Sequence, residues 1–231
     1  MSKHATTYIA LTLTVGSLFL GDSLSFDSDF TNLGNYLICF VLALLTSTLK
    51  VRLPGLTGTI SVNFLFILIS VALFSFSETV LLAALGGIVQ CLWKTKRRPK
   101  PIQVAFNVAV LSISSGLTYR LAHVPVHDDR SLIVLLGLAT CVYFTVNTLL
   151  ISGVLSLMEK KTLVQVWRQC YLWSFPYYAV GALIAAFVVF STQSVGWMTS
   201  LLILPLMYLV YVFYQTCVEH LGHNAPSTKP A

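Results

Sequence analysis

The sequence predicts an all-α integral membrane protein, a multi-pass bundle of about eight transmembrane helices with six as the lower count. Hydrophobic residues make up 56% of the 231 residues and charged residues only 10%, whereas soluble domains are about 25% charged. Apolar runs occupy nearly the whole chain and leave no room for a soluble domain of ordinary size. Because lipid offers the backbone no hydrogen-bond partners, we expect these runs to be helices.

Each apolar run defines one expected helix, and polar or basic residues separate the runs. The first run lies between Lys3, a weak positive region, and Gly21-Asp22-Ser23, a poor cleavage site, so we expect a retained helix and no cleaved signal peptide. The expected helices cover residues 8–20, 36–49, 60–74, 79–93, 102–121, 132–158, 176–191 and 197–214. They form a single membrane domain over residues 1–218, with a short polar cytoplasmic tail over residues 219–231.

The third and fourth runs are the irregular part of this pattern. Pro54 and Gly55 break the chain before them, since proline is unfavourable inside a helix and glycine permits a turn. The runs over residues 60–74 and 79–93 are both shorter than the roughly 20 residues of a full crossing. They form either two tilted spans or a re-entrant hairpin over residues 60–93 that the other helices shelter.

Two local features complete the expected elements. Ser77 is the expected N-cap of the fourth helix, with Glu78 near the positive end of the helix dipole. Residues 159–169 read EKKTLVQVWRQ, an amphipathic connector that we expect at the membrane surface with Trp167 as its interfacial anchor.

Basic residues predict the orientation of the chain. With eight spans, one side of the membrane holds Lys3, Lys50, Arg52, the cluster of Lys94, Lys96, Arg97, Arg98 and Lys100, then Lys160, Lys161, Arg168 and Lys229. The other side holds Arg120 and Arg130. The positive-inside rule makes the richer side cytoplasmic, which predicts a bacterial cytoplasmic (inner) membrane protein with both termini inside. The cluster over residues 94–100 either sets this topology alone or also binds anionic lipid headgroups.

Charge, cysteines and motifs exclude several classes of function. The net charge of +6 comes from short loops between apolar runs, so we expect no nucleic-acid partner. The five cysteines are scattered without a CxxC pair, which indicates buried free thiols. The chain contains no GxSxG, HExxH, Walker or GxGxxG motif and no paired carboxylates within the apolar runs. We therefore expect neither an enzyme nor a cofactor.

Uncharged polar residues at membrane depth are the candidate binding residues. The apolar runs contain Asn63, Gln90, Asn107 and Asn147, and a polar stretch over residues 57–61 enters the third run. Each amide alone has a plain structural role, because amides hydrogen-bond neighbouring helices. Broken helices with polar approaches also bind small ligands, so the predicted ligand-binding set is Thr57, Thr59, Ser61, Asn63 and Asn107. The runs place no charged residue in mid-span, which argues against a proton pump or a charge-driven antiporter.

A histidine pair and a glycine pair are two further features of the sequence. His123 and His127 lie four residues apart beside Asp128, but Pro125 between them disrupts a shared helix face. A polar loop is therefore the favoured interpretation, with a weak metal or proton site outside the membrane as the alternative. The Gly86-Gly87 pair permits close packing of the fourth helix against a neighbour.

Part of the chain resembles a known family. The segments KVRLPGLTGTISVNFLFILISVAL, SETVLLAALGGIVQCLW and RRPKPIQVAFNVA resemble the bacterial membrane-embedded sensor region found N-terminal to HD-GYP phosphodiesterase and GGDEF cyclase domains in cyclic-di-GMP signalling. The likeness runs from about the second expected helix to the eighth and is most specific over residues 50–107. It implies a membrane sensory module. Those proteins continue after the last membrane helix into a catalytic domain, whereas this sequence ends at Ala231, so it is either a stand-alone version or a segment that ends before the effector domain. The resemblance therefore implies no enzymatic output for this sequence.

A looser similarity implies a different function. The TGTIS segment after a Pro/Gly-rich entry, followed by an apolar hairpin with a Gly-Gly second arm, is similar to the substrate-binding S-components of energy-coupling-factor vitamin transporters. The two resemblances imply different partners, either a cytoplasmic signalling protein or a coupling subunit, and both allow a homo-oligomer. The lipid bilayer is the partner that both interpretations share.

Overall fold

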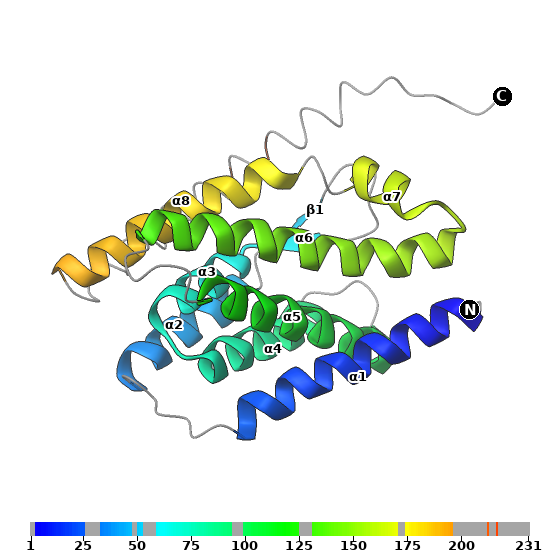
Figure 1. The fold of residues 1–231 in the computed structure, drawn as a ribbon, viewed down its shortest axis with the longest axis horizontal. Helices are drawn as coiled ribbons and strands as arrows, with labels where there is room; N and C mark the ends of the chain where they lie inside the picture. The colour runs from blue at the N-terminus through cyan, green and yellow to red at the C-terminus, as the bar shows by residue number, and fades with distance from the viewer. Residues whose placement is uncertain are drawn as a thin grey trace.

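The computed structural model describes residues 3–25, 33–47, 50–52, 59–93, 99–124, 131–170 and 174–195, together with residues 212 and 216. Over these residues the chain forms eight helices and two short strands (Figure 1). The helices are α1 (Lys3–Ser25), α2 (Leu33–Thr46), α3 (Phe64–Leu73), α4 (Phe76–Leu92), α5 (Pro101–Ala122), α6 (Leu132–Glu159), α7 (Leu163–Cys170) and α8 (Phe175–Val195), and the strands are β1 (Lys50–Arg52) and β2 (Thr59–Ser61).

Four of these helices, α1, α5, α6 and α8, are long and apolar enough to cross a membrane by their length and composition. Three shorter apolar helices, α2, α3 and α4, accompany them. The prediction of a helical protein with several membrane-compatible helices is therefore confirmed. The count of eight crossings and the re-entrant hairpin stay predictions.

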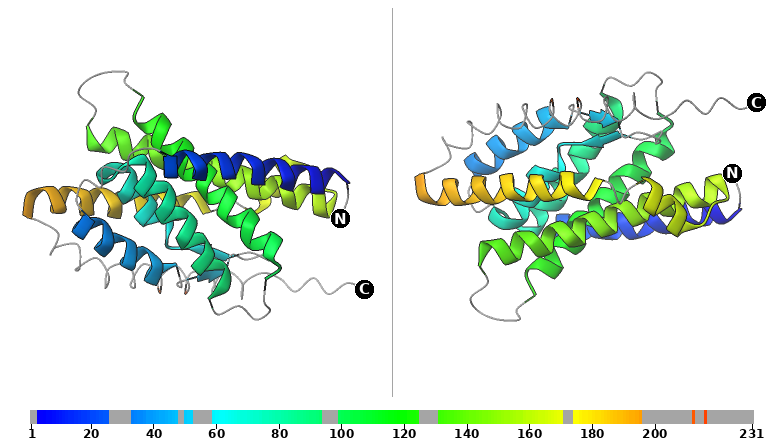
Figure 2. Two further views of the ribbon diagram at one scale, coloured as in Figure 1. Left: turned by 90° about the horizontal axis from the view of Figure 1, so that it is seen from below. Right: turned by 90° about the horizontal axis from the view of Figure 1, so that it is seen from above.

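The helices pack as one bundle in which α5 and α3 are the inner elements. α5 packs against α4, α6 and α1, and Figure 2 shows α4 and α5 side by side and oblique to α1, α6 and α8. α3 packs against α8 and α6, and all its residues from Phe64 to Val71 are buried. A helix this short and apolar is stabilised by its neighbours, since isolated helices below about 12 residues are marginal.

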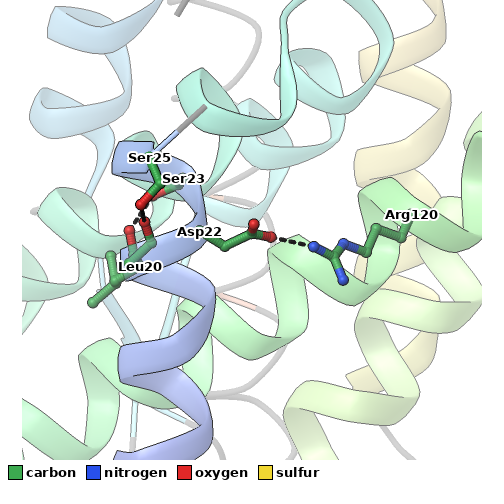
Figure 3. Close-up of polar contacts among 6 residues, drawn as sticks. Leu20, Asp22, Ser23, Ser25 and Arg120 are labelled. Carbon is green, nitrogen blue, oxygen red and sulfur yellow. Dashed lines mark hydrogen bonds and ion pairs between the residues drawn. The ribbon is translucent and has the colours of Figure 1, made fainter. Parts of the chain in front are cut away.

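Contacts of α1 with α6 and α5 define two ends of the bundle. At one end the hydroxyl of Tyr8 in α1 donates to the carbonyl of Leu150 in α6 at 3.0 Å. At the other end of α1, Asp22 forms an ion pair with Arg120 near the end of α5 (Figure 3). The first end holds the basic residues Lys3, Lys100, Lys160 and Lys161, which begin or follow helices that terminate there. We call these the basic end and the Arg120 end.

Small residues hold α1 against α5. A methyl group added at Gly16 would lie 2.6 Å from the Cα of Ala109 in α5, so the two backbones touch at this point. One turn further along, the Phe19 ring occupies the space beside Gly116, and the Arg120 guanidinium lies 5.4 Å from the centre of the same ring. Glycine permits this approach because it has no Cβ, as in other membrane helix pairs.

The structure corrects the predicted start of the third helix. β1 and β2 form an antiparallel ribbon that pairs Lys50 with Ser61 and Arg52 with Thr59, and α3 begins only at Phe64. The predicted helix over residues 60–74 is therefore wrong at its first turn. The ribbon gives this backbone its own hydrogen-bond partners, and the β-branched Thr59 and Ile60 favour an extended conformation.

The start of α4 also differs from the prediction. Ser75 is the N-cap, because its Oγ accepts from the Glu78 N–H at 3.3 Å and the Glu78 Oε2 accepts from the Ser75 N–H at 2.8 Å. This reciprocal capping box satisfies two N–H groups at the helix start. The prediction of Ser77 as N-cap is wrong, and Ser77 lies buried in the first turn.

The ends of the other elements also differ from the predicted ones. α1 extends over Lys3–Ser25 where residues 8–20 were predicted, because its polar ends remain helical with their hydroxyls bonded to carbonyls one turn earlier, as at Thr7 and Ser25. α2 ends at Thr46, before the predicted residue 49. The predicted amphipathic connector contains the short helix α7. The predicted helix over residues 197–214 and the tail over residues 219–231 lie outside the described residues, apart from residue 212.

Candidate functional site

Two of the predicted binding residues approach one pair of glycines. The Asn107 Nδ2 in α5 donates to the carbonyl of Gly87 in α4 at 3.4 Å. Asn63, which precedes α3 and is only 2% exposed, packs against the neighbouring Gly86, with its Cγ 3.1 Å from where a Cβ on Gly86 would lie. The two amides therefore reach α4 at consecutive residues, although one precedes α3 and the other belongs to α5. We call Asn63, Gly86, Gly87 and Asn107 the amide–glycine site.

The glycines make this arrangement sterically feasible. A methyl group at Gly86 would occupy the position of the Asn63 amide, and one at Gly87 would lie 2.7 Å from the Leu111 Cδ1 and 3.6 Å from the Asn107 Nδ2. Both amide groups carry two N–H donors and an acceptor oxygen. The site can therefore offer donors and acceptors without charge inside an apolar bundle.

Aromatic residues continue from the amide–glycine site toward α6 and α8. Phe64 follows Asn63 and lies 4.5 Å, centre to centre, from the ring of Tyr178 in α8. The Tyr178 hydroxyl accepts from the Asn147 Nδ2 of α6 at 3.4 Å, and the Asn147 Oδ1 has no hydrogen-bond partner among the described residues. A band of amides and rings thus crosses the bundle from α5 to α6. The sequence singled out Asn147 but could not place it beside Tyr178.

The remaining predicted site residues lie elsewhere. Thr59 and Ser61 belong to β2, which leads into Asn63, and Thr57 lies outside the described residues. His127 and the cluster residues Lys94, Lys96, Arg97 and Arg98 also lie outside them, whereas Lys100 is exposed at the start of α5. His123 caps the end of α5, where a ring nitrogen lies 2.9 Å from the Tyr119 carbonyl.

The described residues contain no cluster of side chains that is typical of a metal site. No group of three or more His, Cys, Asp or Glu side chains that could hold a metal ion occurs among the described residues. The ring of His123 stacks on Tyr119 with 4.2 Å between ring centres, which accounts for its position without a metal.

Sequence reasoning missed a buried carboxylate. Glu78 is fully buried (0% exposed) in the first turn of α4, and one of its two oxygens, Oε1, has no hydrogen-bond partner among the described residues. The hydroxyl of Tyr36 in α2 donates to the main-chain oxygen of Glu78 at 3.3 Å. The Ser75-x-x-Glu78 spacing before an apolar run is the sequence signature of a capping box. Recognising it would have placed Glu78 inside the helix, although not inside the core.

No protein-family model matches the chain, and neither the curated proteins nor the solved structures contain a match. The resemblance to sensor regions of cyclic-di-GMP signalling proteins accordingly stays a prediction that depends on the quoted segments alone.

Proposed function

We propose that the chain is a membrane-embedded sensory or receptor module that binds a small ligand and has no catalytic output of its own. The observation that carries this proposal is the approach of Asn63 and Asn107 to consecutive glycines of α4. Two uncharged amides in an apolar surrounding are suited to a neutral polar ligand, since they supply both donors and acceptors. The ligand site would be walled by residues 59–63 and by α5 around Asn107, whereas residues 54–58 of the predicted wall lie outside the described residues.

The short buried helix beside the site supports binding over a purely structural role. α3 has ten residues, about 15 Å at 1.5 Å per residue, whereas the hydrocarbon core of a bilayer is about 30 Å thick. Short, interrupted helices inside membrane bundles are where backbone and side-chain groups become available to ligands. A re-entrant hairpin of α3 and α4, sheltered by the other helices, fits this length.

We also propose that the chain lies in the bacterial cytoplasmic membrane with both termini in the cytoplasm. Lys3 begins α1, Lys100 precedes α5, and Lys160 and Lys161 follow α6. α1 runs alongside α5 and opposite to α6, so these lysines lie toward one end of the bundle, and the positive-inside rule makes that end cytoplasmic. A cytoplasmic signalling partner would then meet the basic end. A homo-oligomer is compatible with the exposed apolar side chains of α1 and α8, which include Leu11, Leu18, Leu183 and Phe187.

A transport component is the second candidate function. The same amide–glycine site could hold a substrate, as the similarity to the S-components of energy-coupling-factor transporters implies. That function predicts uptake of the ligand by cells, or co-purification with a coupling subunit. The sensory function predicts ligand-dependent change in a cytoplasmic partner without uptake.

Mass spectrometry of small molecules retained by the purified chain tests ligand binding. We expect a retained compound in the wild type and its loss in Asn63→Leu and Asn107→Leu, because leucine removes the amide donors and acceptors while keeping similar volume. Gln193→Leu is the matched control, since Gln193 is an exposed amide near the end of α8. If the wild type retains no compound, or if Asn63→Leu and Asn107→Leu retain it as well as the control does, the proposed site is wrong.

A further inference from the structure

We propose that Glu78 binds one monovalent cation, an alkali ion or a small ammonium group, in the first turn of α4. This site is separate from the amide–glycine site. Glu78 and Gly86 are eight residues apart on one helix, which is about 12 Å along its axis. The inference therefore does not depend on the proposed ligand site.

Burial of Glu78 is the first step of the argument. Its side chain is fully buried, and its Oε1 has no hydrogen-bond partner among the described residues, while its Oε2 is occupied by the Ser75 N–H. The adjacent Thr79 Oγ1 is likewise buried without a partner in the described part of the chain. Burying an ionisable group without a complete set of partners is costly. The carboxylate oxygen that has no partner within the described ranges is the group that a cation would bind.

No ion pair among the described residues provides a cationic partner for Glu78. The described ion pairs are Asp22 with Arg120 and Glu159 with Lys161, and neither includes Glu78. Arg120 lies over the ring of Phe76 with its Cζ 5.0 Å from the ring centre, and its guanidinium is directed to Asp22 (Figure 3). Arg120 is thus engaged by Asp22 at the Arg120 end, and the described ion pairs do not include Glu78.

The surroundings of Glu78 suit a single positive charge. Tyr36, whose hydroxyl bonds to the Glu78 main chain, packs edge-on against Phe74 with 5.6 Å between ring centres. Phe76 in the same first turn packs edge-on against Tyr119 of α5 at 5.7 Å. Aromatic faces attract cations, and one carboxylate balances one charge. The titratable groups that interact with the Glu78 charge are Tyr36, Cys39 and Tyr119, with His123 stacked on the outer side of Tyr119.

The ligand set argues against a divalent metal. No cluster of three or more His, Cys, Asp or Glu side chains accompanies Glu78 within the described ranges, whereas Ca²⁺ takes six to eight oxygen ligands. One carboxylate and a neighbouring hydroxyl oxygen are compatible with a single monovalent cation. The structure assigns no selectivity between an alkali ion and an ammonium group, so the experiment compares them.

Thermal unfolding of the purified 231-residue chain in detergent tests the site. The chain is titrated with NaCl, KCl or methylammonium chloride, with N-methylglucamine chloride keeping the ionic strength constant. For the wild type we expect at least one of the three cations to raise Tm by about 3 °C or more with saturation, because a cation that binds only the folded state stabilises it. The salt that gives the rise identifies the class of cation.

Three variants show whether Glu78 carries the effect. Glu78→Gln keeps the capping box, which accepts glutamine at this position, and is expected to abolish the rise in Tm. Glu78→Asp keeps the charge on a shorter side chain and is expected to shift the midpoint of the titration to higher concentration. Glu159→Gln is the matched control at an exposed carboxylate and should titrate like the wild type. The proposal is overturned if no cation gives a saturable rise in the wild type, or if Glu78→Gln or Glu78→Asp titrates unchanged.

Discussion

At the scale of single residues, the amide–glycine site depends on two asparagine side chains that pack against glycines of α4. Asn63 is buried against Gly86, and Asn107 is bonded to the carbonyl of Gly87. The Asn63 amide occupies space that a Cβ on Gly86 would need, and the Leu111 side chain occupies the corresponding space beside Gly87. The two glycines are therefore part of the site, and their role is steric.

Replacing Gly86 tests this fit directly. Gly86→Ala places a methyl group where the Asn63 amide lies, and we expect it to destabilise the chain by about 1–3 kcal/mol, the usual cost of overpacking. Gly137→Ala is the control, because nothing lies within 4 Å of a Cβ at that exposed helical position, and alanine there should be neutral or stabilising by up to about 1 kcal/mol. Thermal unfolding in detergent measures both. Equal stabilities of the two variants would contradict the packing of Asn63 on Gly86.

The same residues show what the sequence could and could not predict. Asn63 and Asn107 stood out because amides are uncommon in apolar runs, and the Gly86-Gly87 pair stood out as a packing feature. Their association could not be predicted, because it depends on how α3, α4 and α5 cross in space. Glu78 was assigned to a helix end by its neighbours in sequence, and only tertiary packing by α2 and α5 shows that it is buried.

At the scale of elements, apolar periodicity located helices reliably where they are long. The predicted helices over residues 102–121 and 132–158 correspond to α5 and α6 within one residue at each end. The prediction failed between residues 50 and 63, where a two-stranded ribbon replaces the first turn of a predicted helix. Short segments have few residues to define a period, and pairing between distant strands leaves no mark in local hydrophobicity.

The contact between α1 and α5 gives a prediction for one element. Gly16→Ala would place a methyl group 2.6 Å from the Cα of Ala109, and a backbone cannot move aside as a side chain tip can. We expect α1 to separate from α5 locally, with faster amide hydrogen exchange across α1 than in the wild type, measured by mass spectrometry. Gly21→Ala in the same helix has no atom within 4 Å of the added Cβ and should leave exchange unchanged. Wild-type exchange in Gly16→Ala would contradict the close approach.

At the scale of the whole molecule, composition decides the class and tertiary packing decides the site. Four helices are long and apolar enough to cross a membrane. Lys3, Lys100, Lys160 and Lys161 lie at the basic end, whereas Asp22, Glu78 and Arg120 lie at the other. The positions of both proposed sites are given along the axis that joins the basic end to the Arg120 end. The amide–glycine site lies between the ends, and Glu78 lies toward the Arg120 end. The orientation of the axis therefore decides from which side each site is reached.

Thiol labelling at the two ends of α6 tests the orientation most directly. The helix has 28 residues, about 42 Å in length, and is therefore long enough for its ends to reach opposite sides of a bilayer whose core is about 30 Å thick. Ser131→Cys and Lys161→Cys place single exposed thiols at these ends in a background without the native cysteines. A membrane-impermeant maleimide added to intact cells should label Ser131→Cys and leave Lys161→Cys unlabelled until the cells are opened. Labelling of Lys161→Cys in intact cells, or equal labelling of both positions, would contradict the proposed arrangement.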